Sequence, residues 1–146
     1  MALVLLNQCI ASYAMPPKVI VLAGDDPEDP VHGGQVHARY DGYDGGDCCM
    51  PLHGYAGLSG RLSTTILQAT RFTGPQRLAV VQRLVKRLRP AWPPTLGMVR
   101  GDSHFASPER RPWIAVQPHM GSVTGVTSNA VLQALAREVI EQAKRA

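Results

Sequence analysis

The run from Val19 to Asp29, VIVLAGDDPED, constrains the fold more than any other part of the sequence. Its six apolar or small residues have the length of a β-strand, and continuous apolar strands are typical of sheets covered on both faces. Four carboxylates then occupy the five positions from Asp25 to Asp29, although the chain carries a net charge of +4. Carboxylates this close repel one another. The run therefore predicts a buried strand with an acidic group at its carboxyl end.

The remaining pattern predicts a mixed α/β sheet of about five strands with flanking helices. Strands are expected over 18–24, 48–55, 62–68, 95–99 and 122–126, and helices over 3–13, 75–88 and 129–146. A further short helix is expected after Ser107. Gly57-Leu58-Ser59-Gly60 predicts a hairpin turn, and Pro90 is expected to end the second long helix. This order implies an antiparallel hairpin on one side of the sheet and parallel strands on the other.

The apolar stripes predict which helix faces turn inward. In the last helix the inward set is Val131, Leu132, Leu135, Val139 and Ile140, and in the helix over 75–88 it is Leu78, Val81, Leu84, Val85 and Leu88. The basic residues of that second helix, Arg77, Lys86 and Arg87 among them, are expected largely off the stripe. There they would either contact phosphate or face solvent.

Charge is unevenly distributed along the chain. Residues 1–50 hold two basic and seven acidic side chains, whereas residues 51–146 hold thirteen basic and four acidic ones. An acidic pole beside a basic remainder suits a protein that handles polyphosphate. On the charge distribution alone, a solvated surface that is unevenly charged and has no such role is an equally good interpretation.

A second acidic position, Asp102, follows the strand expected over 95–99. Ligands of open α/β sheets gather at the carboxyl ends of strands, where Asp25 or Asp26 would meet Asp102. Carboxylate oxygens are ligands for hard divalent cations, and two such ions can promote phosphodiester attack. Aspartates at strand ends are also common as caps and turn formers, so both interpretations stay open on the spacing alone.

Five segments resemble one family: DDPEDPVHGGQVHARYDGYDGG (Asp25–Gly46), PLHGYAGLSGRL (Pro51–Leu62), RFTGPQRLAVVQRLVKRLRPAWPPTL (Arg71–Leu96), RGDSHF (Arg100–Phe105) and VTGVTSNAVLQALAREVIEQAKRA (Val123–Ala146). The chain is similar, from about Asn7 onward, to the bacterial insertion-sequence transposases of the DDE type, which have a ribonuclease-H-like catalytic domain. The resemblance implies metal-dependent DNA strand cleavage and transfer, with Mg²⁺ or Mn²⁺ as cofactor and transposon ends and target DNA as partners. We expect an N-terminal helix and linker over 1–17 and a partial catalytic domain over 18–146.

The resemblance also assigns roles residue by residue. The first catalytic aspartate matches Asp25, with Asp26 as the rival assignment, and the second matches Asp102. The expected metal ligands are Asp25, Asp26 and Asp102. The residues expected to contact DNA are Arg77, Lys86, Arg87, Arg100 and His104.

The sequence departs from the family pattern at the first strand end, where Ala23 replaces an aspartate and Pro27 a threonine. The family's third acid is a glutamate on a helix beyond the last residue of this chain, and Glu138 and Glu141 are expected on a solvated helix face. We therefore expect a truncated fragment, incomplete at its C-terminus, that binds metal weakly and is inactive alone. The alternative is a catalytically inactive remnant with weak non-specific DNA binding. Self-association or a complementing fragment stay open as partners.

Neither a membrane-spanning segment nor a disulfide framework is expected. No apolar run reaches the ~18 residues of a membrane span. Three cysteines, at positions 9, 48 and 49, form no even framework. A cytoplasmic location is the expectation.

Overall fold

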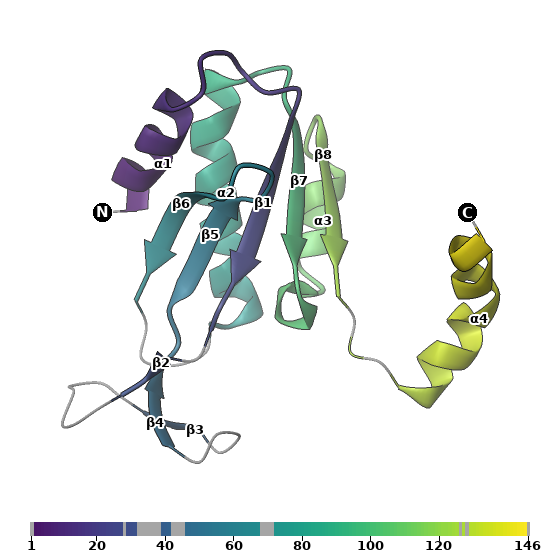
Figure 1. Cartoon of the computed structure of the whole chain (residues 1–146). Helices are drawn as coiled ribbons and strands as arrows, with labels where there is room; N and C mark the ends of the chain where they lie inside the picture. The colour runs from purple at the N-terminus through teal and green to yellow at the C-terminus, as the bar shows by residue number, and fades with distance from the viewer. Residues whose placement is uncertain are drawn as a thin grey trace.

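The computed structural model describes residues 2–27, 29–31, 39–41, 46–67, 72–125, 127 and 129–145. Its main sheet has five strands in the order β6-β5-β1-β7-β8 (Figure 1). The strands are β1 (Val19–Asp25), β5 (Leu52–Ala56), β6 (Arg61–Ile66), β7 (Leu96–Gly101) and β8 (Met120–Thr124). The helices are α1 (Ala2–Ala11), α2 (Gly74–Ala91), α3 (Arg110–Ala115), α4 (Ala130–Arg145) and the 3₁₀ turn η1 (Ser103–Phe105).

Strand β1 lies at the centre of this sheet. It pairs antiparallel with β5 and parallel with β7, and β7 pairs parallel with β8. Strands β5 and β6 form the hairpin that the turn at 57–60 predicts. The mixed α/β sheet of about five strands with flanking helices is thereby confirmed.

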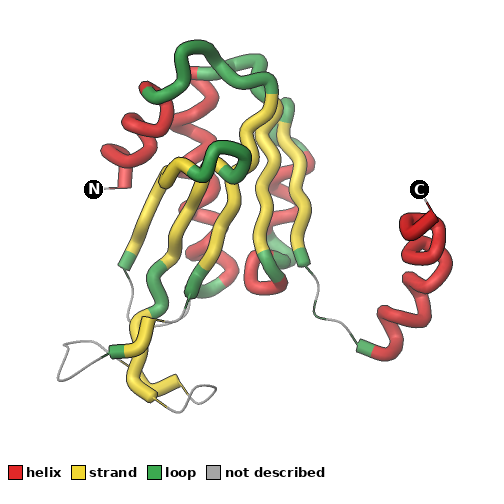
Figure 2. Tube along the Cα trace, viewed as in Figure 1, coloured by secondary structure: helices red, strands yellow, loops and turns green. Residues whose placement is uncertain are grey.

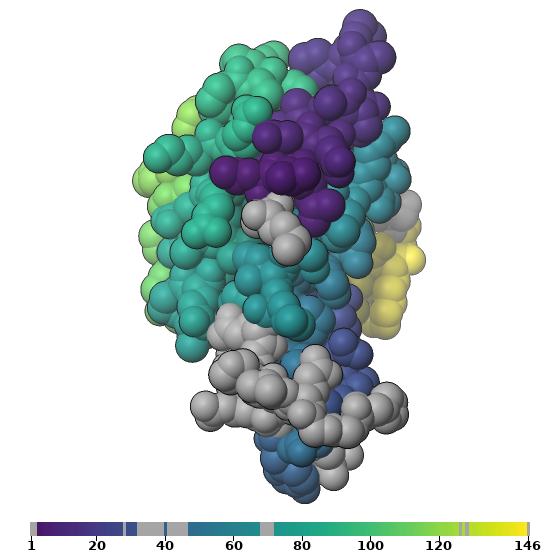
Figure 3. Space-filling view, turned by 90° about the vertical axis from the view of Figure 1, so that its left-hand side faces the viewer, coloured from purple at the N-terminus to yellow at the C-terminus, as the bar shows by residue number. Residues whose placement is uncertain are grey.

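Helices α1, α2 and α3 pack against one face of the sheet (Figure 2). Figure 3 shows α1 lying against α2, where the Nε of Arg87 donates a hydrogen bond to the Asn7 side chain at 2.8 Å. The core joins these helices to the strands through Leu6, Cys9, Ile20, Leu22, Val81, Leu84, Val85, Leu88, Trp92, Val99 and Ile114.

The expectation that β1 is covered on both faces is wrong for the second face. Ile20 and Leu22 are buried, but Val21 and Ala23 on the opposite face are only half-buried, and Val19 is 38% exposed. Side chains alternate along a strand, so this pattern means that helices cover one side of β1. Within the described residues, no helix buries the other side.

Helix α2 is longer than its sequence pattern predicts. A capping box begins it: the Thr73 side chain accepts a hydrogen bond from the Gln76 backbone N–H, and the Gln76 side chain accepts one from the Thr73 N–H. The helix continues through Pro90, which was expected to end it. Pro90 has no N–H to donate, yet helical hydrogen bonding resumes after it, because the Trp92 N–H reaches the Leu88 carbonyl at 2.9 Å.

The strand expected over 48–55 is split in two. Its first part belongs to β4 (Gly46–Cys49), which lies between β2 (Asp29–Pro30) and β3 (Arg39–Asp41) in a separate three-stranded sheet. Pro51 separates the two parts and has no N–H to continue a ladder. All three cysteines are buried, and burial raises the pKa of Cys9 against a smaller opposing effect of Arg61.

The expectation that the last helix turns an apolar stripe inward is wrong. Helix α4 contains no buried residue, and its five apolar stripe residues are 40–77% exposed. Figure 1 shows α4 standing apart from the sheet beyond β8. The periodicity correctly predicts the helix, but periodicity specifies only which side is apolar and not what covers it. No described helix is both long and apolar enough to cross a membrane.

Deleting residues 127–146 is therefore expected to change the free energy of unfolding by less than about 0.5 kcal/mol, because α4 contributes no buried side chain. Urea unfolding of the full and shortened chains measures this. Leu6→Ala, which empties a fully buried site of α1, serves as the positive control with a loss of about 2–5 kcal/mol. A loss above about 1 kcal/mol on deletion would show that α4 packs against the body in solution.

Candidate metal centre

The parallel pairing of β1 and β7 brings two acidic strand ends together. Ala23 lies opposite Arg100 in the register, so both strands end at the same edge of the sheet. Asp25 is the last residue of β1, Asp26 follows it, and Asp102 follows the last residue of β7. The carboxyl-end gathering of acids that the sequence predicts is present in the fold.

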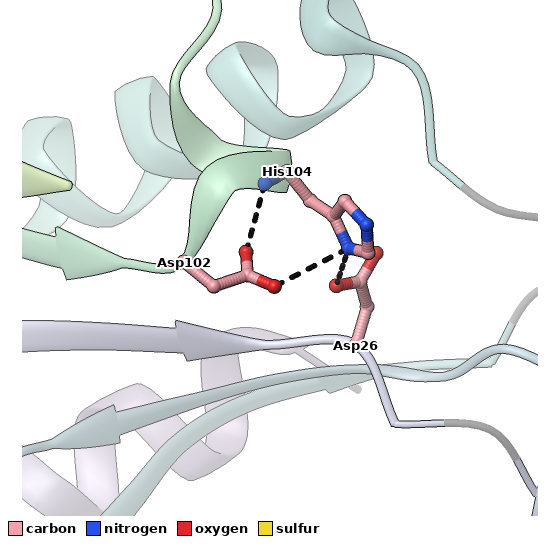
Figure 4. A group of neighbouring side chains, drawn as sticks. All are labelled: Asp26, Asp102 and His104. Atoms are coloured by element: carbon pink, nitrogen blue, oxygen red, sulfur yellow. Dashed lines mark hydrogen bonds and ion pairs between the residues drawn. The ribbon is translucent and has the colours of Figure 1, made fainter. Parts of the chain in front are cut away.

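Three side chains converge at this edge: Asp26, Asp102 and His104 (Figure 4). The Nδ1 of His104 lies 3.2 Å from Oδ1 of Asp26 and 3.4 Å from Oδ2 of Asp102. One potential ligand atom from each residue lies within 4.8 Å of the others. Two carboxylates and one imidazole at this spacing form a donor set for a divalent cation.

The turn η1 positions His104 between the two aspartates. Asp102 caps this turn, and its Oδ1 accepts a hydrogen bond from the backbone N–H of His104 at 2.9 Å. The next residue, Phe105, is buried and anchors the turn to the strand ends. A side chain at Gly101 would place its Cβ 2.5 Å from Cγ of Phe105, so the ring packs this closely only because Gly101 has none.

The group runs from the protein interior to the solvent. The side chain of Asp26 is 2% exposed, that of His104 34% and that of Asp102 55%. Solutes can therefore reach the group from the Asp102 side, while Asp26 forms its floor.

Asp26 is held from below by α2. Arg77 donates from Nη2 to Oδ2 of Asp26, and both side chains are almost fully buried. The Arg77 guanidinium also lies 5.5 Å from the Phe105 ring centroid. This contact leaves Oδ1 of Asp26 facing His104.

A second buried guanidinium, that of Arg110, lies 5.6 Å from the same ring. Burial lowers the pKa of Arg110, and the positive charge of Arg77 lowers it further. Its Nη1 is buried and has no hydrogen-bond partner among the described residues. Two buried guanidinium groups thus lie over the Phe105 ring, and that of Arg77 is paired with the buried carboxylate of Asp26.

Asp25 and Arg100 lie at the same end of the strands, beside the group of Asp26, Asp102 and His104. Both line an open hollow of about 410 Å³ together with Asp102 and Tyr55. Asp25 is exposed and does not belong to the group of Asp26, Asp102 and His104. The structure thus brings both candidate aspartates near Asp102, with only Asp26 contacting His104.

The other residues expected to contact DNA are dispersed. Lys86 and Arg87 lie exposed on α2, two to three turns beyond Arg77. The expectation that Arg77 lies off the apolar stripe is wrong, because its side chain is buried against Asp26. Glu138 and Glu141 lie exposed on α4, where Glu141 pairs with Lys144 at 2.9 Å.

The sequence contains a signal that Arg77 lies on the inward face of its helix. Arg77 precedes Val81 by four residues and Leu84 by seven, which is the helical spacing of one face. The partner charge on Asp26 lies 51 positions away. No local sequence pattern connects Arg77 with Asp26. The helical spacing that marks Arg77 as inward-facing has no counterpart for Arg110 or Phe105.

Comparison with known proteins finds a family match and structures of similar fold. A family model described as "Transposase DDE domain group 1" matches residues 1–146. A structure of piggyBac transposase in a synaptic complex with hairpin DNA superposes with a TM-score of 0.59 at 19% identity, covering 85% of this chain and 26% of that one. A chain of the simian T-cell lymphotropic virus intasome in complex with PP2A regulatory subunit B56 gamma gives 0.50 at 12% identity, covering 93% and 46%. The chain thus spans less than half of either neighbour. No curated protein matches its sequence.

Proposed function

The chain belongs to the transposase DDE domain family, group 1, and from that premise we propose that it carries a divalent-cation site for DNA strand cleavage and transfer. The single observation that carries the proposal is the convergence of Asp26, Asp102 and His104 at the carboxyl edge of the sheet. Asp26 serves as the first carboxylate, since it contacts His104 while Asp25 lines the adjoining hollow.

The residues present suit a divalent cation. Asp26 and Asp102 offer hard carboxylate oxygens, and His104 offers a nitrogen, a combination that suits Mn²⁺ as well as Mg²⁺. When bound, such an ion supplies Lewis-acid stabilisation of a phosphodiester and lowers the pKa of an attacking water or hydroxyl. Asp102 is the exposed ligand at the entrance, and the buried Asp26 fixes the depth of the site.

DNA is the proposed partner, and Arg100 is its proposed contact at this edge. Arg100 is exposed in the hollow beside Asp25 and Asp102. A cation there can attract a backbone phosphate toward the two aspartates. The piggyBac neighbour, which is described in complex with hairpin DNA, supports the same class of partner.

Binding of Mn²⁺, followed by titration calorimetry, tests the proposed site. We expect weak binding by the native chain and a loss of affinity of at least about tenfold in Asp102→Asn, which removes a charged ligand. Asp25→Asn, equally exposed and one strand away, is the matched control and should keep most of the affinity. Equal binding by the native chain and Asp102→Asn would contradict the proposal.

A plasmid-nicking assay on the same proteins separates the full activity from its alternative. We expect no nicking by the native chain alone with Mg²⁺ or Mn²⁺, since the described part of the chain brings two carboxylates and no third one into the group. Nicking that is lost in Asp102→Asn would mean that these residues suffice for cleavage. Salt-sensitive DNA binding without nicking would fit a non-catalytic remnant.

A further inference from the structure

The ion pair between Arg77 and Asp26 is unusual for a purely stabilising contact. Both side chains are almost fully buried, so both charges have lost their hydration. Among the residues that the structure describes, the buried Nε of Arg77 has no hydrogen-bond partner, and neither does the buried Nη1 of Arg110. A buried pair with unmet donors gains little stability over apolar residues of the same size. Its value must therefore be sought in the charge that it places beside Asp26.

Charge balance at the group shows what that placement does. Asp26 and Asp102 bring two negative charges, and Arg77 and Arg110 bring two positive ones within the same small cluster around Phe105. Asp26 is thus already paired with a positive charge before any other cation arrives. Arg77 takes Oδ2 of Asp26 and leaves Oδ1 toward His104, so the two roles use different oxygens of one carboxylate.

We propose that Arg77 is a resident counter-charge of the candidate metal centre: it orients Asp26 and limits how tightly the site holds a divalent cation. This inference rests on the proposed function, since it concerns the same carboxylates. Arg110 adds to the effect through its own buried charge. Arg77 is a positioning residue, because it acts on the cation through Asp26.

A counter-charge role and a purely structural role for Arg77 predict opposite changes in cation affinity when Arg77 is replaced. If Arg77 only holds Asp26 in place, its removal disorders the site and weakens cation binding. If Arg77 competes with the divalent cation for the negative charge of Asp26, replacing Arg77 by a neutral residue strengthens cation binding. The repulsion between two cations on one carboxylate at low effective dielectric predicts a gain of about tenfold or more.

The experiment compares Mn²⁺ affinity, by titration calorimetry, and melting temperature with and without Mn²⁺. Arg77→Gln removes the charge and keeps a donor, whereas Arg77→Lys keeps the charge. Arg83→Gln removes an exposed charge from the same helix and is the matched control. We expect Arg77→Gln to bind Mn²⁺ about tenfold or more tightly than the native chain. Arg77→Lys and Arg83→Gln should stay within about twofold of it.

The melting temperature gives a second readout. Arg77→Gln should melt lower than the native chain in EDTA, and Mn²⁺ should raise its melting temperature by more than it raises that of the native chain. If Arg77→Gln does not fold even with Mn²⁺, Arg110→Gln decides, with a smaller gain in affinity expected. Affinity in the deciding variant no higher than native would overturn the proposal.

The outcomes separate this proposal from the one on which it rests. Native binding that is lost in Asp102→Asn, with no gain in Arg77→Gln, would leave the metal site standing and refute the role of Arg77. Native binding unaffected by Asp102→Asn would refute both.

Discussion

Replacing Asp26 by alanine is expected to lower the free energy of unfolding by about 3–5 kcal/mol. The change leaves the Arg77 guanidinium buried without its carboxylate, beside a second buried cation, Arg110. An uncompensated charge in the interior is among the largest destabilising effects of a single substitution. Urea unfolding in metal-free buffer measures it, since EDTA prevents a bound cation from masking the loss.

The adjacent aspartate provides the control. Asp25 is exposed, so Asp25→Ala is expected to change the unfolding free energy by less than about 0.5 kcal/mol. Two neighbouring substitutions of the same type should thus differ by several kcal/mol. Equal losses would mean that the buried pair does not exist in solution, and the choice of Asp26 over Asp25 as the first carboxylate would lose its basis.

Phe105→Ala is expected to cost about 3–5 kcal/mol, the range for removing a buried aromatic ring. Phe105 is 3% exposed. Its ring packs against β1 and β7 in the space left by Gly24 and Gly101, which have no side chains. Both buried guanidinium groups lie over it. Its loss should therefore also weaken Mn²⁺ binding, because η1 carries His104 on the same short turn.

A double-mutant cycle isolates the ring's contact with the strand end. Gly101→Ala should cost about 1–3 kcal/mol in the native background, since its Cβ would overlap the Phe105 ring. In the Phe105→Ala background the same change should cost much less, because the space is empty. Additive losses in the double mutant would show that the ring does not pack on Gly101.

The sequence predicts the sheet better than it predicts what surrounds it. The apolar run at Val19–Gly24 and the turn at 57–60 are local signals, and both match the structure. The final helix is also a local signal, yet its packing is not, so α4 forms while its apolar stripe stays exposed. Pro90 shows the same limit: the local signal predicts a helix end, yet the Trp92 N–H still bonds to the Leu88 carbonyl beyond it.

The candidate site divides in the same way. Strand-end acids are visible in the sequence, because a buried strand followed by aspartate is a local pattern. The choice between Asp25 and Asp26 depends on which of two successive side chains points toward α2, and only the twist and register of the assembled sheet decide that. The contact from Arg77 depends on packing between segments distant in the chain.

That distance has a consequence for how the protein is made. Asp26 is 51 residues from Arg77 and 78 from His104, and His104 follows β7, so the contact with His104 requires the crossover through α2 that lets β7 pair in parallel with β1. Parallel strands of this kind pair slowly, because the entropy of closing a long loop is lost before the strand contacts form. While the chain is being synthesised, β1 can first pair only with β5, and its other edge remains an open template for misassembly until residues 96–101 emerge. The aspartate at the floor of the candidate centre therefore obtains both of its partners only after residue 104 has been synthesised, and substitutions near it should reduce the yield of folded protein before they affect its chemistry.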